Sequence, residues 1–173
     1  AKQGGLVARL SAIEEAAAMT ILASDKTGTI TENSLKLNAI RAYPPYREDD
    51  VIRFGAQASR AATQDPLDLA ILAGAHDRQI DLVGERLDFT PFEPATKRSE
   101  ALIAQPEGTN LRILKGAPQA ITALTGEQDI NADVAEFAAS GNRVLAVAVG
   151  PDSGPFQLVG LLGLQDTPRP DSK

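Results

Sequence analysis

The chain has 173 residues, of which 43% are hydrophobic and 23% charged, a composition typical of a globular protein with a sizeable core. Its net charge of −6 argues against nucleic acid as a partner, because phosphate binding draws its affinity from clustered Lys and Arg. The sequence contains no Cys, which excludes thiolate metal sites, and its apolar runs are shorter than the roughly 20 residues that a membrane helix needs.

The N-terminal residues predict a helix, a buried strand and a loop in succession. Ser11 and Glu14 have the spacing of a capping box, and they precede an Ala-rich helical run that reaches Met19. Residues 19–23 predict a short buried strand, and residues 24–29 predict the loop at its carboxyl end. Because ligands bind at that edge of open α/β sheets, we regard this loop as a candidate site.

Two longer helices are predicted in the middle of the chain. The first runs from Glu48 to Ala62, and the second begins with Asp65 as its N-cap and Pro66 in its first turn. A strand at 35–40 precedes both helices.

The remaining elements predict an antiparallel sheet. Several strand candidates follow one another with few residues between them, which favours antiparallel pairing, with helices on one face, over βαβ winding. The strands are expected at 85–90, 99–105, 110–115, 143–149 and 156–162, with short helices at 118–124 and 132–140.

The segment from Asp25 to Thr31 has the residues needed for phosphoryl transfer. A carboxylate such as that of Asp25, placed at a strand end, can attack phosphorus and form an aspartyl phosphate. Lys26, Thr27 and the loop amides can hold the phosphate oxygens, and Gly28 permits a close turn of the backbone. A Mg²⁺ ion would neutralise charge during transfer. A chance loop of small polar residues is the alternative interpretation.

This segment resembles the phosphorylation motif of the P-type ATPases, Asp-Lys-Thr-Gly-Thr followed by Leu or Ile and Thr, at every position from Asp25 to Thr31. Ala23 stands where that family usually has Cys. The wider resemblance is to haloacid-dehalogenase-like phosphotransferases, whose phosphatases carry a second Asp where this chain has Thr27. Without that general acid and base the aspartyl phosphate should hydrolyse slowly, which favours a pump over a phosphatase. The resemblance implies that Asp25 and Thr27 bind Mg²⁺.

Residues 88–98 are similar to a nucleotide-domain segment of the same family. The resemblance implies that Phe92 stacks on adenine and that Lys97 is a nucleotide-site lysine. An aromatic face offers a base roughly 1 to 3 kcal/mol of stacking. The alternatives are an ordinary core residue for Phe92 and a solvated surface side chain for Lys97.

Three further segments resemble nucleotide-site motifs of P-type ATPases. Lys115 and Gly116 match a Lys-Gly-Ala motif whose lysine lines the adenine pocket. Arg143 matches an arginine that contacts the nucleotide phosphates, and a structural salt bridge is its alternative role. Asp68 matches an acidic contact to the adenine amino group, although a first-turn acid is also favoured by the helix dipole alone.

The resemblance implies three regions in the chain. Residues 1–37 would be the N-terminal part of a haloacid-dehalogenase-like, Rossmann-like phosphorylation domain. Residues 38–157 would form an antiparallel nucleotide-binding domain inserted in it, and residues 158–173 the returning segment. Because the first residue is Ala1 rather than Met, we expect the chain to be a segment of a longer protein.

The implied function is a cation pump that uses ATP and Mg²⁺ at the cytoplasmic face of the cell membrane. Its partners would be the membrane helices and other cytoplasmic domains of the intact pump, and the segments at 88–98 and 160–171 favour the plasma-membrane proton pump branch. The later Thr-Gly-Asp and Gly-Asp-Gly-x-Asn-Asp motifs are not in this sequence, so we expect this chain to bind ATP without turnover. The alternatives are a soluble phosphatase and a nucleotide-binding module in which Asp25 is idle.

Overall fold

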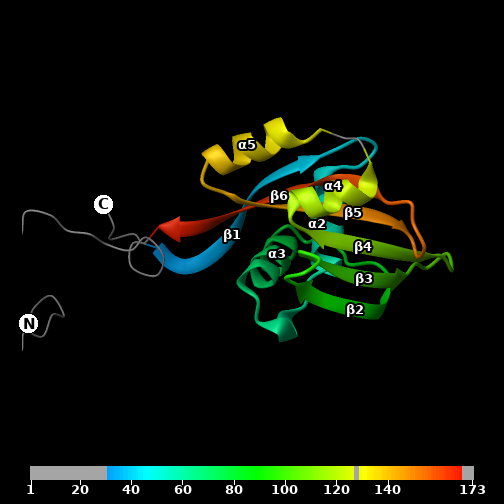
Figure 1. The fold of residues 1–173 in the computed structure, drawn as a ribbon. Helices are drawn as coiled ribbons and strands as arrows, with labels where there is room; N and C mark the ends of the chain where they lie inside the picture. The colour runs from blue at the N-terminus through cyan, green and yellow to red at the C-terminus, as the bar shows by residue number, and fades with distance from the viewer. Residues whose placement is uncertain (1–30, 127–128, 169–173) are drawn as a thin grey trace, which may run out of the picture.

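A six-stranded antiparallel sheet forms the centre of the protein (Figure 1). The computed structural model describes residues 31–126 and 129–168, so the predicted helix, strand and loop that precede residue 31, including Asp25, lie outside the described residues. The strand order is β1-β6-β5-β4-β3-β2. The strands are β1 (Thr31–Ala42), β2 (Glu85–Glu93), β3 (Arg98–Ala104), β4 (Asn110–Gly116), β5 (Arg143–Pro151) and β6 (Gln157–Pro168).

Four α-helices and one 3-10 turn accompany this sheet in the described residues. They are α2 (Glu48–Gln57), η2 (Ala61–Thr63), α3 (Pro66–Asp77), α4 (Pro118–Thr125) and α5 (Asn131–Ala139). None of these helices is long and apolar enough to cross a bilayer.

The start of α3 confirms its predicted N-cap. Asp65 accepts hydrogen bonds from the backbone N–H of Leu67 at 2.8 Å and of Asp68 at 3.3 Å, and Pro66 occupies the first helical position. These acceptors satisfy amides that have no partner inside the helix.

The predicted helix from Glu48 to Ala62 is too long, because α2 ends at Gln57. Arg60 has extended backbone angles, and its N–H donates to the Asp68 carboxylate at 2.9 Å instead of to a carbonyl of its own turn. A partner eight residues further along the chain, outside the predicted helix, therefore takes this N–H out of a segment whose composition could have continued as helix.

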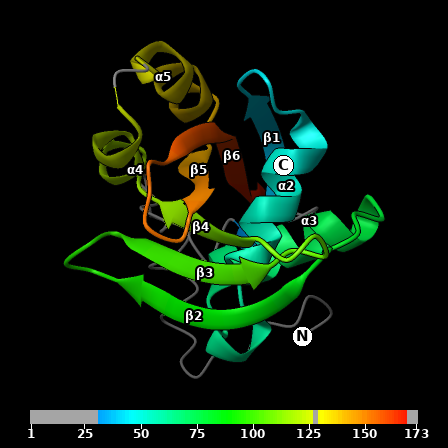
Figure 2. The same ribbon diagram turned by 90° about the vertical axis from the view of Figure 1, so that its right-hand side faces the viewer.

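Helices cover both faces of the sheet, so the prediction of helices on one face is wrong. Figure 2 shows α4 and α5 on one side of the strands and α2 and α3 on the other. Along β5, Leu145 and Val147 pack in the core cluster that contains α2 and α3, whereas Ala146 and Ala148 pack in the cluster of α4 and α5. Because both alternating sets of side chains are apolar, each face of the central strands needs its own cover.

The strands β1 and β6 form a continuous antiparallel ribbon along one edge of the sheet. They pair from Thr31 with Pro168 to Ala42 with Gly160, with irregularities between Thr31 and Leu35 and between Leu37 and Ala39. The predicted domain boundary at 37/38 lies within β1, and the boundary at 157/158 lies at the start of β6; both boundaries stay predictions.

Candidate functional site

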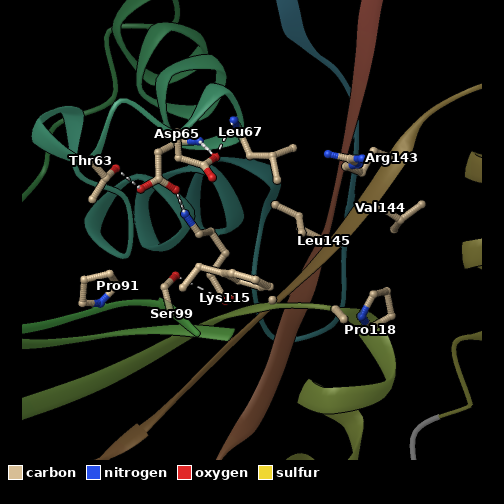
Figure 3. Close-up of a pocket in the computed structure, with 14 residues that line it drawn as sticks. Thr63, Asp65, Leu67, Pro91, Ser99, Lys115, Pro118, Arg143, Val144 and Leu145 are labelled. Carbon is tan, nitrogen blue, oxygen red and sulfur yellow. Dashed lines mark hydrogen bonds and ion pairs between the residues drawn. The ribbon is translucent and has the colours of Figure 1, made fainter. Parts of the chain in front are cut away.

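A cavity of about 530 Å³ lies where the start of α3, the ends of β2 and β4, and the start of β5 meet. Figure 3 shows Lys115 reaching from β4 toward the start of α3, and Arg143 and Thr63 on opposite sides of the space. Of the six residues predicted to bind a nucleotide, five line this cavity. They are Asp68, Phe92, Lys115, Gly116 and Arg143.

The sixth predicted residue, Lys97, is not among the residues that line the cavity. It lies in the turn between β2 and β3, where its side chain is exposed and its φ is 54°. Its carbonyl oxygen accepts a hydrogen bond from the N–H of Ala117 at 3.0 Å, which ties this turn to the residue after β4. Lys97 thus lies beside the cavity wall.

Lys115 is a buried cation at the inner end of the cavity. It is 4% exposed, and its Nζ donates to Oγ of Ser59 at 2.6 Å and to Oδ1 of Asp68. Burial lowers the pKa of Lys115 below its usual value, because loss of water disfavours the charged form, while the Asp68 carboxylate opposes this shift. A buried cation needs such a partner, since an unpaired charge in this position is very costly.

Asp68 is held by three elements at once. It is 8% exposed, and its Oδ2 accepts from the N–H of Arg60 at 2.9 Å and from Oγ1 of Thr63 at 3.3 Å, while Oδ1 pairs with Lys115. Each carboxylate oxygen therefore has a protein partner. The turn after α2, the 3-10 turn and β4 together fix the position of this acid.

Phe92 presents its ring to the cavity and to solvent. It is 54% exposed near the end of β2, which rules out the alternative that it is an ordinary core residue. An exposed aromatic face beside a cavity can stack on a flat ring of a ligand and exclude water from it.

Gly116 is required by the packing of the protein backbone. A Cβ at this position would lie 2.3 Å from the carbonyl oxygen of Lys97 and 2.7 Å from Cα of Arg98. The end of β4 can approach the β2–β3 turn this closely only with glycine. This contact brings the segments that carry Lys97 and Lys115 together.

Arg143, the first residue of β5, is exposed at the edge of the cavity. Among the side chains that the structure describes it takes part in no ion pair, so the alternative of a structural salt bridge has no support there. Its guanidinium group is available for a ligand anion.

Sequence motifs did not identify several other residues of the site. Thr63 and Ser99 also line the cavity, and Asp65, predicted only as a helix cap, lines it too. Ser59 contacts Lys115 from 56 positions away. No motif marks Ser59 or Thr63. The role of Ser59 depends on a long-range contact that a single sequence does not display, whereas Thr63 bonds to Asp68 only five residues further along the chain.

No family model matches the chain, but curated proteins do. A protein of Methanocaldococcus jannaschii assigned as a cation-transporting ATPase is 37% identical over 182 residues, which cover 99% of this chain. The plasma membrane ATPase of Dunaliella bioculata is 34% identical over 186 residues, which cover all of it. The chain is a homologue of P-type cation-transporting ATPases. It spans 22% and 16% of the lengths of these two relatives.

A solved structure supports the fold of this P-type ATPase homologue. The N-domain of HMA8, a copper-transporting P-type ATPase, superposes with a TM-score of 0.51 over 73% of this chain and 97% of that domain, at 18% identity. Such a likeness concerns the fold, and it confirms the predicted antiparallel sheet domain with flanking helices.

The predicted Mg²⁺ ligands of the P-type ATPase homologue, Asp25 and Thr27, lie outside the described residues. In the part of the chain that the structure describes, no group of three His, Cys, Asp or Glu side chains could hold a metal ion. A Mg²⁺ site in this P-type ATPase homologue therefore stays a prediction from the segment 25–31.

Proposed function

We propose that this chain is the ATP-binding part of a P-type cation pump and that the cavity beside Lys115 binds the nucleotide. The observation that carries the proposal is the convergence of Asp68, Phe92, Lys115 and Arg143 on one cavity. These residues come from separate elements, and each has a chemistry suited to one part of ATP.

The size and lining of the cavity fit a nucleotide. Its volume of about 530 Å³ is in the usual range for small-molecule sites. The ring of Phe92 would stack on the base, and the polar pair of Lys115 and Asp68 would face the edge of the base at the inner end. Arg143 would bind the phosphates, because its planar guanidinium group can donate two parallel hydrogen bonds to phosphate oxygens. Lys97, on the neighbouring turn, would add a second positive charge from outside the cavity.

In the whole protein we infer that Asp25 accepts the terminal phosphoryl group of ATP. A carboxylate oxygen of Asp25 would attack the γ-phosphorus, the bond from this phosphorus to the bridging oxygen would break, and ADP would leave. Lys26 and Thr27 would hold the γ-phosphate oxygens. Asp25 and Thr27 would hold Mg²⁺, which would neutralise the negative charge that develops during transfer.

We further infer that the pump transports protons across the cell membrane, with this chain on the cytoplasmic face. This inference rests on the residues at 88–98 and 160–171 and on the 34% identity to a plasma membrane ATPase. The membrane helices and remaining cytoplasmic domains of the intact pump would be its partners.

A calorimetric titration of the chain with ATP, continued to several millimolar, tests the nucleotide site. Phe92→Ala should weaken binding about 5- to 150-fold, since stacking contributes roughly 1 to 3 kcal/mol per base. Leu87→Ala is the matched control, because Leu87 is in the same strand and is 52% exposed but does not line the cavity. Absence of binding, or equal effects of the two variants, would contradict the proposal.

We also infer that the chain by itself binds ATP without turnover. Incubation with ATP labelled in its γ-phosphate should leave Asp25 without appreciable label, and an aryl phosphate with Mg²⁺ should not be hydrolysed. Label on Asp25 would contradict this inference, and aryl phosphate turnover would favour the phosphatase alternative.

A further inference from the structure

The turn that follows α2 contacts both members of the buried ion pair. Oγ of Ser59 accepts from Lys115 Nζ at 2.6 Å, and the N–H of the next residue, Arg60, donates to Oδ2 of Asp68 at 2.9 Å. Two consecutive residues of one turn therefore hold the cation and the anion. Ser59 itself is 1% exposed and does not line the cavity, so it can act on a ligand only through its neighbours.

Two side chains, one from the edge strand β2 and one from its neighbour β3, fix this turn. Nη2 of Arg86, on β2, donates to the carbonyl oxygens of Gln57 and Ser59, both at 2.8 Å. Oγ of Ser99, on β3, donates to the carbonyl oxygen of Ala58 at 3.1 Å. The last carbonyls of a helix lack partners within it, so these donors both complete the end of α2 and fix the backbone that carries Ser59.

The hydroxyl of Ser59 has a defined direction. It donates to the carbonyl oxygen of Gly55 at 2.8 Å, which leaves its lone pairs directed at the ammonium group of Lys115. Together with Asp68, it provides two of the acceptors that three ammonium protons can use. A lysine side chain has a flexible four-carbon stem, and two fixed acceptors restrict it to one position.

We propose that Ser59 is a positioning residue of the nucleotide site: held by Arg86 and Ser99, it fixes the ammonium group of Lys115 at the inner end of the cavity. This proposal rests on the proposed function, because it concerns the same site. Ser59 touches no ligand in this account, and its effect on binding passes entirely through Lys115.

A double-mutant cycle in ATP binding tests the proposal. Ser59→Ala should weaken the affinity of the chain for ATP roughly tenfold, as expected when a hydrogen bond to a charged group is lost. In a Lys115→Met background the same substitution should have no further effect, because the group that it positions is absent. A loss of similar size in both backgrounds would overturn the proposal, since it would show that Ser59 acts independently of Lys115.

Ser140→Ala is the matched control for this experiment. Ser140 makes the same kind of hydrogen bond to the carbonyl four residues earlier, Glu136, at 3.1 Å, but it lies at the end of α5 and does not line the cavity. It should leave ATP affinity unchanged. If Ser140→Ala weakened binding as much as Ser59→Ala does, the effect would reflect helix-end stability, and the positioning role would be refuted.

A readout without ATP separates this proposal from the proposed function. In ¹H–¹⁵N spectra that detect lysine ammonium groups, Lys115 should give a slowly exchanging signal that Ser59→Ala removes and Ser140→Ala retains. Failure of the unaltered chain to bind ATP would refute the proposed function but leave this test in force. If ATP binding depended on Phe92 but the Lys115 signal were unchanged in Ser59→Ala, only the positioning role would be refuted.

Discussion

Lys115 is a cation almost without solvent contact, and Asp68 is its only negatively charged partner among the described residues. Burial lowers the pKa of Lys115, and the Asp68 carboxylate, helped by the negative charge of Asp65, opposes this shift and favours the charged form. The hydroxyl of Ser59 adds a hydrogen bond to the ammonium group. The site therefore depends on an ion pair whose members cannot be removed singly without leaving an unbalanced charge in the protein interior.

Asp68→Asn should lower the free energy of unfolding by roughly 3 to 5 kcal/mol at pH 7, because it leaves a buried ammonium group without its counter-charge. Urea denaturation provides the measurement. Asp152→Asn, which breaks the more exposed pair with Arg112, should cost less than about 1 kcal/mol. Similar losses in the two variants would show that the pair of Lys115 and Asp68 is not effectively buried.

Sequence motifs predict which residues line the site better than they predict the contacts that those residues make. Phe92, Lys115 and Arg143 were singled out from short patterns, and the structure brings them to one cavity. Ser59 could not be found in the same way, because it gains its role from a contact with Lys115, 56 residues away. Thr63 contacts Asp68 only five residues away, but no motif marks it. A hydroxyl in an ordinary stretch of sequence carries no sign of such a contact.

At the scale of elements, α3 depends on a cap that was predictable. Asp65→Ala should reduce the free energy of unfolding by about 1 kcal/mol, since two amides of the first turn lose their acceptor. Asp65→Asn, which keeps an acceptor oxygen, should retain most of the stability. The prediction fails if both variants unfold at the same urea concentration as the unaltered chain.

A tyrosine joins the end of β1 to α5, and its contribution to stability is lost at high pH. The hydroxyl of Tyr43 donates to Oδ2 of Asp133 at 2.6 Å, and burial, followed by this hydrogen bond, raises the pKa of Tyr43. The unfolded chain ionises near pH 10 while the folded protein stays protonated, so the contribution of Tyr43 is complete below pH 10 and declines above it.

Tyr43→Phe tests this dependence. At pH 8 the variant should be less stable than the unaltered chain by roughly 1.5 to 3 kcal/mol, as expected for a hydrogen bond to a charged group. The difference should shrink between pH 10 and pH 11, when measured by urea denaturation at each pH. A difference that is constant over this range would contradict the raised pKa.

The succession of strands could be predicted from the sequence, but the helices that cover each face of the sheet could not. The short connections between 85 and 116 indicated antiparallel pairing, which the sheet has. Apolar residues at successive positions of β5 and β6 require that helices cover both faces of these strands. This pattern shows burial on two sides, but it does not show which helix covers which side. The early end of α2 likewise follows from the hydrogen bond between Arg60 and Asp68.

For the whole molecule, the cavity is assembled from regions that are remote in sequence. Its walls come from α3, from β2 and β3, from β4 and from β5, and the long ribbon of β1 and β6 completes the sheet along the other edge. A ligand that fills the cavity therefore touches five separate parts of the chain. This arrangement makes the location of binding testable without any substitution.

The most direct test of the proposed nucleotide site is a titration of the ¹⁵N-labelled chain with ATP, monitored through the backbone amide shifts. The largest changes should appear in the five parts of the chain that line the cavity, at 63–68, Phe92, Ser99, 115–117 and 143–145, while α5 beyond Phe137 should be little affected. Changes concentrated outside these segments, or none up to several millimolar ATP, would contradict the claim that the cavity beside Lys115 is the nucleotide site.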